Sequence, residues 1–433
     1  MSIRHFVIAV AAALAALFVP IAYPQIVRPD AVSAERGGAA LRELISEALS
    51  NNPEIRAARN EAEAARQRVS PAGALDDPML EVGLLNVPTD SWRLNREDMT
   101  MKMLGLAQRF PFPGKRALRR EVAERDAGTA EHGYRETVNR VARQVKLAYF
   151  DLSLALESVR LLKDTTLVLE QFMRIVESRY AVGQGAQADV FKAQTQLAKM
   201  REELLRMERE RPVMEAELTM LLGRPGAASI VAPLPGTPQL RLDLESLRET
   251  ALRQRPQLLA LRNMVDKNKA AIELARKEYN PDFDVRLSYG QRDSMLDGTK
   301  RPDMVSLTVA INLPIWGEQK VNPRIAEALS MRDQAQSMYH AQQNEVFAKL
   351  RQQVAIAEQS RKSAELYDTA ILPQARLAVE SALSAYRVNR VDLLMLLDSQ
   401  MNLFNFGIGR AAAVVNLNKA LAEIGLLTGA QQI

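Results

Sequence analysis

The sequence contains one internal duplication, which constrains the fold more than any other feature. Pro53 and Pro256 lie 203 residues apart, each near the start of an apolar pattern with helical spacing. The same offset joins Pro78 to Pro281, Leu104 to Leu307, Pro111 to Pro314 and Gly114 to Gly317. Chance similarity between helical sequences seldom keeps one offset over such a stretch without a gap. We therefore expect two copies of one unit, residues 39–224 and 242–428, joined by a Pro/Gly-rich linker at 225–241.

Each copy is predicted to begin with a helix, at about residues 39–70 and 244–278, followed by two strands. The strands are expected at about residues 78–86, 100–110, 281–290 and 303–313. In the third strand, Phe283, Val285 and Leu287 share one face, while the polar Asp284 and Arg286 share the other. Four strands are too few to close a barrel, so either several chains contribute strands or the strands pack on helices.

A long helix and a shorter returning helix complete each copy. The long helices are expected at about residues 115–182 and 322–388, and the first has an apolar heptad seam. The chain then turns at Gly183, Gln184 and Gly185 in the first copy, and at Asn389 and Arg390 in the second. Glycine and asparagine tolerate left-handed dihedral angles, which end helices. These turns predict helical hairpin tips at about residues 182–189 and 388–392.

Composition excludes several classes of function. The chain has no cysteine and three widely spaced histidines, which excludes thiolate metal sites and zinc-peptidase helices. It also has no nucleophile elbow, phosphate-binding loop or paired carboxylates, so we expect neither an enzyme nor a bound cofactor or metal. Acidic and basic residues alternate along the helices, and the net charge of +5 therefore predicts solvated helical faces rather than nucleic-acid binding.

The run MTMKM places Met99, Met101 and Met103 at alternate positions of a predicted strand. Thioethers bind Cu(I) or Ag(I), and this spacing puts all three side chains on one face. By the 203-residue offset, Met101 aligns with Met304 on the polar face of the second strand pair. Methionine also commonly fills gaps in packing. Metal contact by these residues therefore stays open at this stage.

The N-terminus has the pattern of an export signal, with a basic start at Arg4 and an apolar run from Phe6 to Ala22. We predict a signal peptide at residues 1–34, cleaved after Ala34. No later stretch is expected to be apolar enough for a transmembrane helix. Any membrane span of the mature chain would then consist of strands.

Taken together, these features resemble the TolC-type outer-membrane factors, the outer membrane efflux protein family. The resemblance covers nearly the whole mature chain and includes the duplication, the order of elements and both hairpin tips. It also includes the strand-to-helix turns at Pro111, Gly114, Pro314 and Gly317. Residues 84–127 further resemble the CzcC- and CusC-like branch, which accompanies heavy-metal RND pumps.

The resemblance implies a mainly α fold with a membrane β-barrel, built as a homotrimer. Each chain would contribute four strands to a twelve-stranded barrel, and long coiled-coil helices to an α-barrel tunnel in the periplasm. This passive duct would lie in outer-membrane lipid and receive heavy-metal cations from an inner-membrane RND-type pump through a periplasmic adaptor (membrane fusion protein). The alternatives are a duct for drug efflux or type I protein secretion or, in another class, a periplasmic coiled-coil scaffold or adaptor.

The resemblance also implies a gate and a docking site at the tips. Asp189 matches an aspartate that a tyrosine, here Tyr386, bonds to hold the periplasmic mouth shut, and Asp398 matches a ring carboxylate. The residue patterns leave alternatives, because Tyr386 can simply close an apolar seam and Asp189 can favour the positive end of its helix. The adaptor is expected to dock on the turn residues, which are Gly183, Gln184, Gly185, Asn389 and Arg390.

Overall fold

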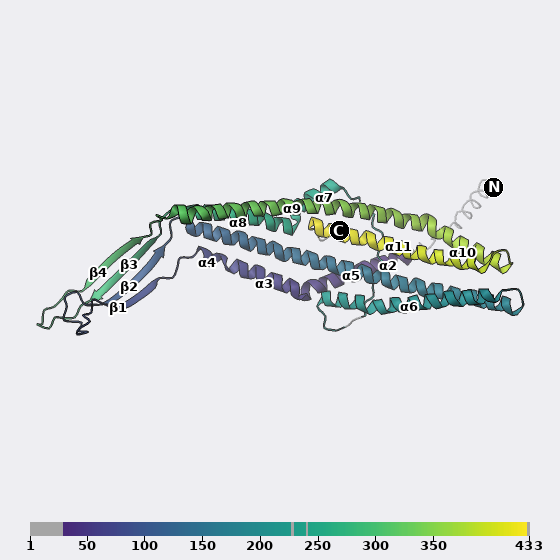
Figure 1. Cartoon of the computed structure of the whole chain (residues 1–433), viewed down its shortest axis with the longest axis horizontal. Helices are drawn as coiled ribbons and strands as arrows, with labels where there is room; N and C mark the ends of the chain where they lie inside the picture. Colours follow the sequence, from purple (N-terminus) through teal and green to yellow (C-terminus); the bar gives the residue numbers. More distant parts are fainter. Residues whose placement is uncertain (1–28, 227–228, 240, 431–433) are drawn as a thin grey trace, which may run out of the picture.

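The computed structural model describes residues 29–226, 229–239 and 241–430 of the 433-residue chain. The predicted signal peptide, residues 1–34, lies outside these ranges except for residues 29–34. The described chain forms one elongated molecule, with a sheet at one end and two helical hairpin tips at the other (Figure 1). Long helices connect the two ends.

The elements of the first copy are α2 (Pro29–Asn51), α3 (Pro53–Gln67), α4 (Val69–Gly73), β1 (Met79–Leu85), β2 (Met101–Phe110), α5 (Lys115–Ala181) and α6 (Gln187–Leu222). Those of the second copy are α7 (Leu244–Gln254), α8 (Pro256–Lys277), β3 (Phe283–Gln291), β4 (Met304–Ile311), α9 (Gly317–Leu366), the π turn η1 (Tyr367–Ile371), α10 (Leu372–Arg387) and α11 (Leu393–Thr428). The single first helix predicted for each copy is interrupted before its proline. Asn52 and Arg255 have extended backbone, with ψ of 124° and 117°, because the residue before a proline is driven out of the α conformation.

Each returning helix ends against this interruption. α6 and α11 both end at a glycine with left-handed backbone, Gly223 (φ 68°) and Gly429 (φ 76°). A Cβ on Gly223 would lie 2.9 Å from the carbonyl oxygen of Asn51, and a Cβ on Gly429 would lie 2.6 Å from that of Gln254. Both obstacles are backbone atoms, so only glycine fits without a backbone shift. Each copy therefore has the same contact between the terminal glycine of its returning helix and the interrupted first helix, and we call this contact the glycine joint.

The sheet is antiparallel in the order β1-β2-β3-β4, and the β2–β3 pairing joins the two copies. Directly paired residues in such a sheet share a face. One face carries apolar rows, for example Val82, Leu104, Tyr289 and Val305, which are 45–76% exposed. A neighbouring row on the other face is polar or small and consists of Glu81, Gly105, Ser288 and Ser306. The predicted alternation is confirmed, and the apolar face is uncovered in the single chain.

The helices bury apolar clusters along α5. The heptad positions Val141, Val145, Leu152, Leu162, Leu169 and Val176 are all buried. Near the middle of the molecule they pack with α2 and α6, and near the tips with α6, α10 and α11. Against the prediction, one helix of the described chain, α11, is long and apolar enough to cross a membrane by length and composition. Since 67% of its apolar window is buried inside the molecule, it is accounted for as a core helix.

The second copy contains a π turn, η1, where α5 of the first copy continues as a regular helix. Buried positions show its origin. Val346 follows Val141 by 205 residues, whereas Ala375 follows Leu169 by 206. One residue is thus added between these positions, and the wider hydrogen-bonding pattern of a π turn absorbs it.

Candidate functional site at the hairpin tips

Both hairpin tips use the same backbone turn. Gly183 (φ 76°) follows α5 at the same place as Asn389 (φ 64°) follows α10. In each tip the next amide N–H donates to the carbonyl oxygen five residues earlier, at 2.8 Å from Gln184 and 2.9 Å from Arg390. Of the predicted turn residues, Gly183 and Asn389 thus have the expected left-handed backbone. This geometry satisfies carbonyl groups that the end of a helix leaves unpaired.

Arg179, in the last turn of α5, links the two tips. It donates to the carbonyl oxygen of Tyr386 at 2.6 Å and to Oδ1 of Asn389 at 2.7 Å. It also donates to the carbonyl oxygen of Gln184 at 3.1 Å, within its own tip. Its guanidinium carbon lies 4.5 Å from the centroid of the Tyr386 ring, within the range of a cation–π contact. Arg179 therefore adds polar contacts to the apolar cluster that the two hairpins share.

Arg179 was not predicted as a site residue, and Arg390 was named only as a turn residue. A signal was available, because a cation in the last turn of a helix is placed to bind the terminal carbonyl groups. The identity of its partners on the other hairpin could not be read from the sequence. Those contacts join residues more than 200 positions apart.

Tyr386 is 3% exposed and belongs to an apolar cluster shared by α5, α6, α10 and α11. Burial raises the pKa of Tyr386, while Arg179 acts against this shift and Asp189 adds to it. The phenol therefore stays protonated at neutral pH and can donate a hydrogen bond. Tyr180, the equivalent residue of the first copy, is 46% exposed and does not share this setting.

Asp189 lies in the first turn of α6, where the positive end of the helix dipole favours a carboxylate. The next residue, Val190, packs against the apolar cluster that contains Tyr386, and the charge of Asp189 adds to the raised pKa of Tyr386. The hydrogen bonds among the described residues include none between them. Within one chain, Tyr386 is contacted by Arg179 instead.

Asp398 lies further along α11 and is exposed. It accepts a hydrogen bond from the Nδ2 group of Asn402 at 3.1 Å. The carboxylate borders a groove of about 590 Å³ between α6 and α11, which Lys192 and Lys199 also line. The structure thus brings Asp189 and Tyr386 to one tip and places Asp398 apart from them, beside cations of α6.

The tips expose large apolar side chains. Val182 and Val388 flank the two turns, and Phe191 and Leu394 lie at the starts of the returning helices. All four are more than half exposed. A Cβ on Gly183 would meet no atom within 4 Å, whereas one on Gly185 would lie 3.2 Å from the backbone nitrogen of Tyr180. Exposed apolar patches of this kind mark interaction sites.

The predicted strand-to-helix turns lie at the other end of the long helices. They contain Pro111, Gly114, Pro314 and Gly317. Gly114 has left-handed backbone (φ 93°), while a Cβ on Gly317 would overlap the ring of Tyr279. The two aligned glycines are thus required for different reasons: Gly114 for its positive φ, and Gly317 for the lack of space beside Tyr279. The buried Asp282 ties the first turn to the second copy by accepting from Nζ of Lys115 at 2.8 Å.

The described residues contain no group of three or more His, Cys, Asp or Glu side chains that could hold a metal ion. The polar groups at the tips form stacking contacts and hydrogen bonds between helices. Such contacts can bias a passage between closed and open arrangements.

The sequence profile of a family described as "Outer membrane efflux protein" matches residues 44–224 and 247–430. The chain is 24% identical over 398 residues to the cobalt-zinc-cadmium resistance protein CzcC of Cupriavidus metallidurans, covering 91% of this chain and 90% of CzcC. It is 25% identical over 408 residues to the outer membrane protein OprJ of Pseudomonas aeruginosa, covering 88% and 84%. The crystal structure of the outer membrane protein VceC from Vibrio cholerae superposes with a TM-score of 0.77 at 19% identity, covering 92% of this chain and 98% of VceC.

Proposed function

The chain belongs to the outer membrane efflux protein family, and from this premise we propose that it is the duct through which a tripartite pump exports heavy-metal cations. Membership makes it an outer-membrane efflux channel with a periplasmic helical tunnel. It is a passive channel and not an enzyme. The match of both copies to the family profile is the observation that carries the proposal.

The sheet supports an assembly of three chains. Within the described sheet, β1 and β4 are edge strands with one neighbour each, and four strands are too few to close a barrel. Joining β4 of one chain to β1 of the next, three times, gives twelve strands without an open edge. The uncovered apolar rows would then face lipid, and the polar face would line a water-filled passage.

Two observations favour heavy-metal cations as the substrate. The similarity to CzcC, a cobalt-zinc-cadmium resistance protein, extends over nine-tenths of both chains. Residues 84–127 also have the pattern of the heavy-metal branch. The pump would be of the RND type, and its periplasmic adaptor would contact the exposed apolar residues of the hairpin tips.

The tips would form the periplasmic gate of the assembled duct. Arg179 fastens the second hairpin to the first in each chain, and Tyr386 and Asp189 are close enough to influence each other. In a trimer, the phenol of Tyr386 can donate to a carboxylate. Three copies of Asp398 around a lumen would favour cations.

Growth of a deletion strain tests this function. Loss of the chain should lower tolerance to cobalt, zinc, cadmium, copper or silver salts, and expression of the wild-type chain should restore it. Tolerance that is unchanged for metals but lost for drugs, or a loss of protein secretion instead, would contradict the metal assignment and favour the corresponding alternative.

Docking at the tips can be tested in the same strain. Replacing Val182 and Val388 with aspartate puts charge on the exposed apolar tips and should abolish tolerance while trimers still form. The matched control is Val231→Asp, which changes an exposed valine of the linker. Full tolerance in the tip variant would show that the adaptor docks elsewhere.

A further inference from the structure

A row of alternating glycines and methionines crosses the polar face of the sheet. From β1 to β4 the row is Gly83, Met103, Gly290 and Met304. Directly paired residues share a face and lie about 4.5–5.5 Å apart. Each methionine of the row therefore has a directly paired neighbour without a side chain.

Met101 brings a third thioether beside this row. It lies two residues before Met103 on β2, so the two side chains share a face. A Cβ on Gly290 would overlap the sulfur atom of Met101, which shows that this sulfur already lies over the glycine. Gly290 is also the residue that pairs with both Met103 and Met304. The sulfur atom of Met101 thus lies over the residue that pairs with Met103 on one side and with Met304 on the other.

The surroundings argue against simple packing. Methionine often fills gaps in apolar cores, but these three lie on the polar face, whose next row contains Glu81 and two serines. Met101 is 8% exposed, while Met304 is 39% exposed. The cluster is therefore accessible from the passage side through Met304 and closed behind Met101.

We propose that Met101, Met103 and Met304 form a binding site for a soft monovalent cation, Cu(I) or Ag(I). Thioether sulfur prefers such ions, whereas zinc and cobalt favour imidazole or carboxylate ligands, which this row lacks. The inference rests on the proposed export of metal cations and deepens it by naming their class.

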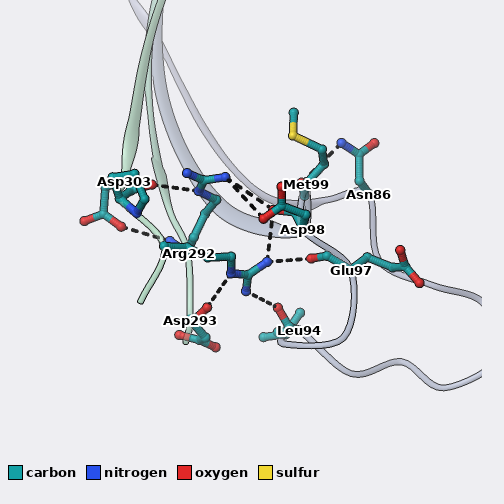
Figure 2. Close-up of polar contacts among 10 residues, drawn as sticks. Asn86, Leu94, Glu97, Asp98, Met99, Arg292, Asp293 and Asp303 are labelled. Atoms are coloured by element: carbon teal, nitrogen blue, oxygen red, sulfur yellow. Dashed lines mark hydrogen bonds and ion pairs between the residues drawn. The ribbon is translucent and has the colours of Figure 1, made fainter. Parts of the chain in front are cut away.

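Contacts between the two strand-connecting loops fix the strand ends that carry the site. Arg301 donates to the carbonyl oxygens of Leu94 at 3.1 Å and Asp293 at 2.6 Å, which joins the first loop to the second. The amide N–H of Arg292 donates to Oδ1 of Asp303 at 2.9 Å (Figure 2). Arg292 is two residues after Gly290, so these contacts hold the metal-facing strands in register. A metal site needs such support to keep its ligand spacing.

Silver binding by the purified full-length protein tests the site. The protein in detergent is dialysed against silver nitrate in chloride-free buffer, and bound silver is measured by mass spectrometry. Wild type should retain silver, and the variant M101L/M103L/M304L should lose it, because leucine matches methionine in volume but has no sulfur. Equal silver retention by the variant and the wild type would overturn the proposal.

The matched control replaces three exposed methionines of the helices, as M331L/M338L/M395L, and should retain silver like the wild type. Heat-modifiable migration in gels verifies that both variants assemble. Zn(II) in the same dialysis should not be retained by the three thioethers; zinc retention that the site variant loses would overturn the assignment to soft ions.

The outcomes separate this site from the proposed function. If silver does not bind but the strain still needs the chain for metal tolerance, only the thioether site is wrong. If silver binds at the three methionines but tolerance does not depend on the chain, the site stands as a binding site and the export function falls.

Discussion

The two helical hairpins share a backbone turn but differ in the charge placed beside it. Asp392 caps the start of α11, and its carboxylate accepts a hydrogen bond from the N–H of Met395 at 3.0 Å. Ala186 stands at the equivalent position before α6 and provides no side-chain cap. The first hairpin instead has its carboxylate three residues later, at Asp189. Asp392 thus caps a helix with its side chain, whereas Asp189 makes no cap hydrogen bond and lies in the first turn of α6.

The two long helices also differ in regularity. α5 runs as a single helix of 67 residues, whereas the second long helix contains η1. Beside this π turn, Asp368 pairs with Arg410 at 2.9 Å, and a Cβ on Gly409 would overlap the hydroxyl group of Tyr367. Duplication has preserved the contacts that depend on backbone, such as the turns and the glycine joints. Side-chain charge and helix regularity have diverged.

The glycine joints should show the largest effect. Gly429→Ala puts a Cβ against a backbone oxygen and into left-handed conformation, which should cost about 3 kcal/mol. Gly223→Ala, with a slightly longer approach, should cost about 2 kcal/mol. Gly226→Ala is the control, because it also has positive φ but meets no atom within 4 Å. Thermal unfolding of the purified protein gives the ranking; equal losses at all three sites would mean that the joints do not constrain the fold.

Arg179→Ala gives the first tip the residue that the second tip has at Ala385. The change removes charge-assisted hydrogen bonds to the other hairpin. Such bonds contribute about 1.5–3 kcal/mol each, and partial exposure to water reduces this contribution. Proteases should then cleave the tips faster, and conductance in planar bilayers should rise. Arg174→Ala, at an exposed position of the same helix, is the control. Unchanged conductance and cleavage would show that Arg179 does not hold the tips together.

Exchanging the helix caps tests the charge difference directly. Asp392→Ala should cost about 1 kcal/mol, because α11 loses its N-cap hydrogen bond. Ala186→Asp should stabilise α6 by about 0.5–1 kcal/mol, since it provides the cap that this helix lacks. Hydrogen exchange of the first turns of both helices measures the effect. The two substitutions should change helix stability in opposite directions. Destabilisation by both of them would contradict the proposed difference between the caps.

The smallest expected effect is a pH dependence of stability, and it comes from a difference between the residues that precede the two prolines. Asn52 donates to the carbonyl oxygen of Leu221 at 2.8 Å, whereas a guanidinium nitrogen of the buried Arg255 lies 3.8 Å from a carboxylate oxygen of the partly buried Glu136. Burial raises the pKa of Glu136 above its ordinary 4.5, more than Arg255 lowers it. A raised pKa means that the folded state holds this proton more tightly than the unfolded state. The resulting stabilisation is complete below pH 4.5 and is lost as the pH rises through the folded-state pKa.

The thermal midpoint of the wild type, compared with that of Glu136→Gln at each pH, should therefore fall as the pH rises from 4.5. The glutamine variant lacks the titrating group and serves as the reference. A difference that stays constant, or that increases with pH, would contradict the raised pKa.

Local sequence patterns were enough to predict the strands and the turns. Alternation at Phe283, Val285 and Leu287 depends only on neighbouring residues, and the structure has β3 at Phe283–Gln291. Gly183 and Asn389 likewise adopt the positive φ expected from their residue types. The interruptions before the prolines were predictable by the same local rule, but the helical pattern on both sides of each proline hid them.

Features that depend on distant contacts were not predictable. Arg179 acts on Tyr386 and Asn389, which the fold alone brings to it. The offset between the copies grows from 203 at Gly114 and Gly317 to 206 at Tyr180 and Tyr386, but the residue that η1 absorbs is located only when buried positions are compared. The predicted gate residues Asp189, Tyr386 and Asp398 came from family resemblance, and the roles proposed for them concern contacts between chains.

The pairing of β2 with β3 also sets an order of events during folding. The partner of Phe110 is Phe283, and the whole α5–α6 hairpin lies between them in the chain. When the N-terminal half leaves the translocation machinery, β1 and β2 form at most an isolated hairpin, which is marginal in water. Its apolar residues and open edge stay exposed until the second copy follows, a state prone to aggregation. The β1–β2 hairpin is therefore the apolar surface that stays exposed longest while the chain folds.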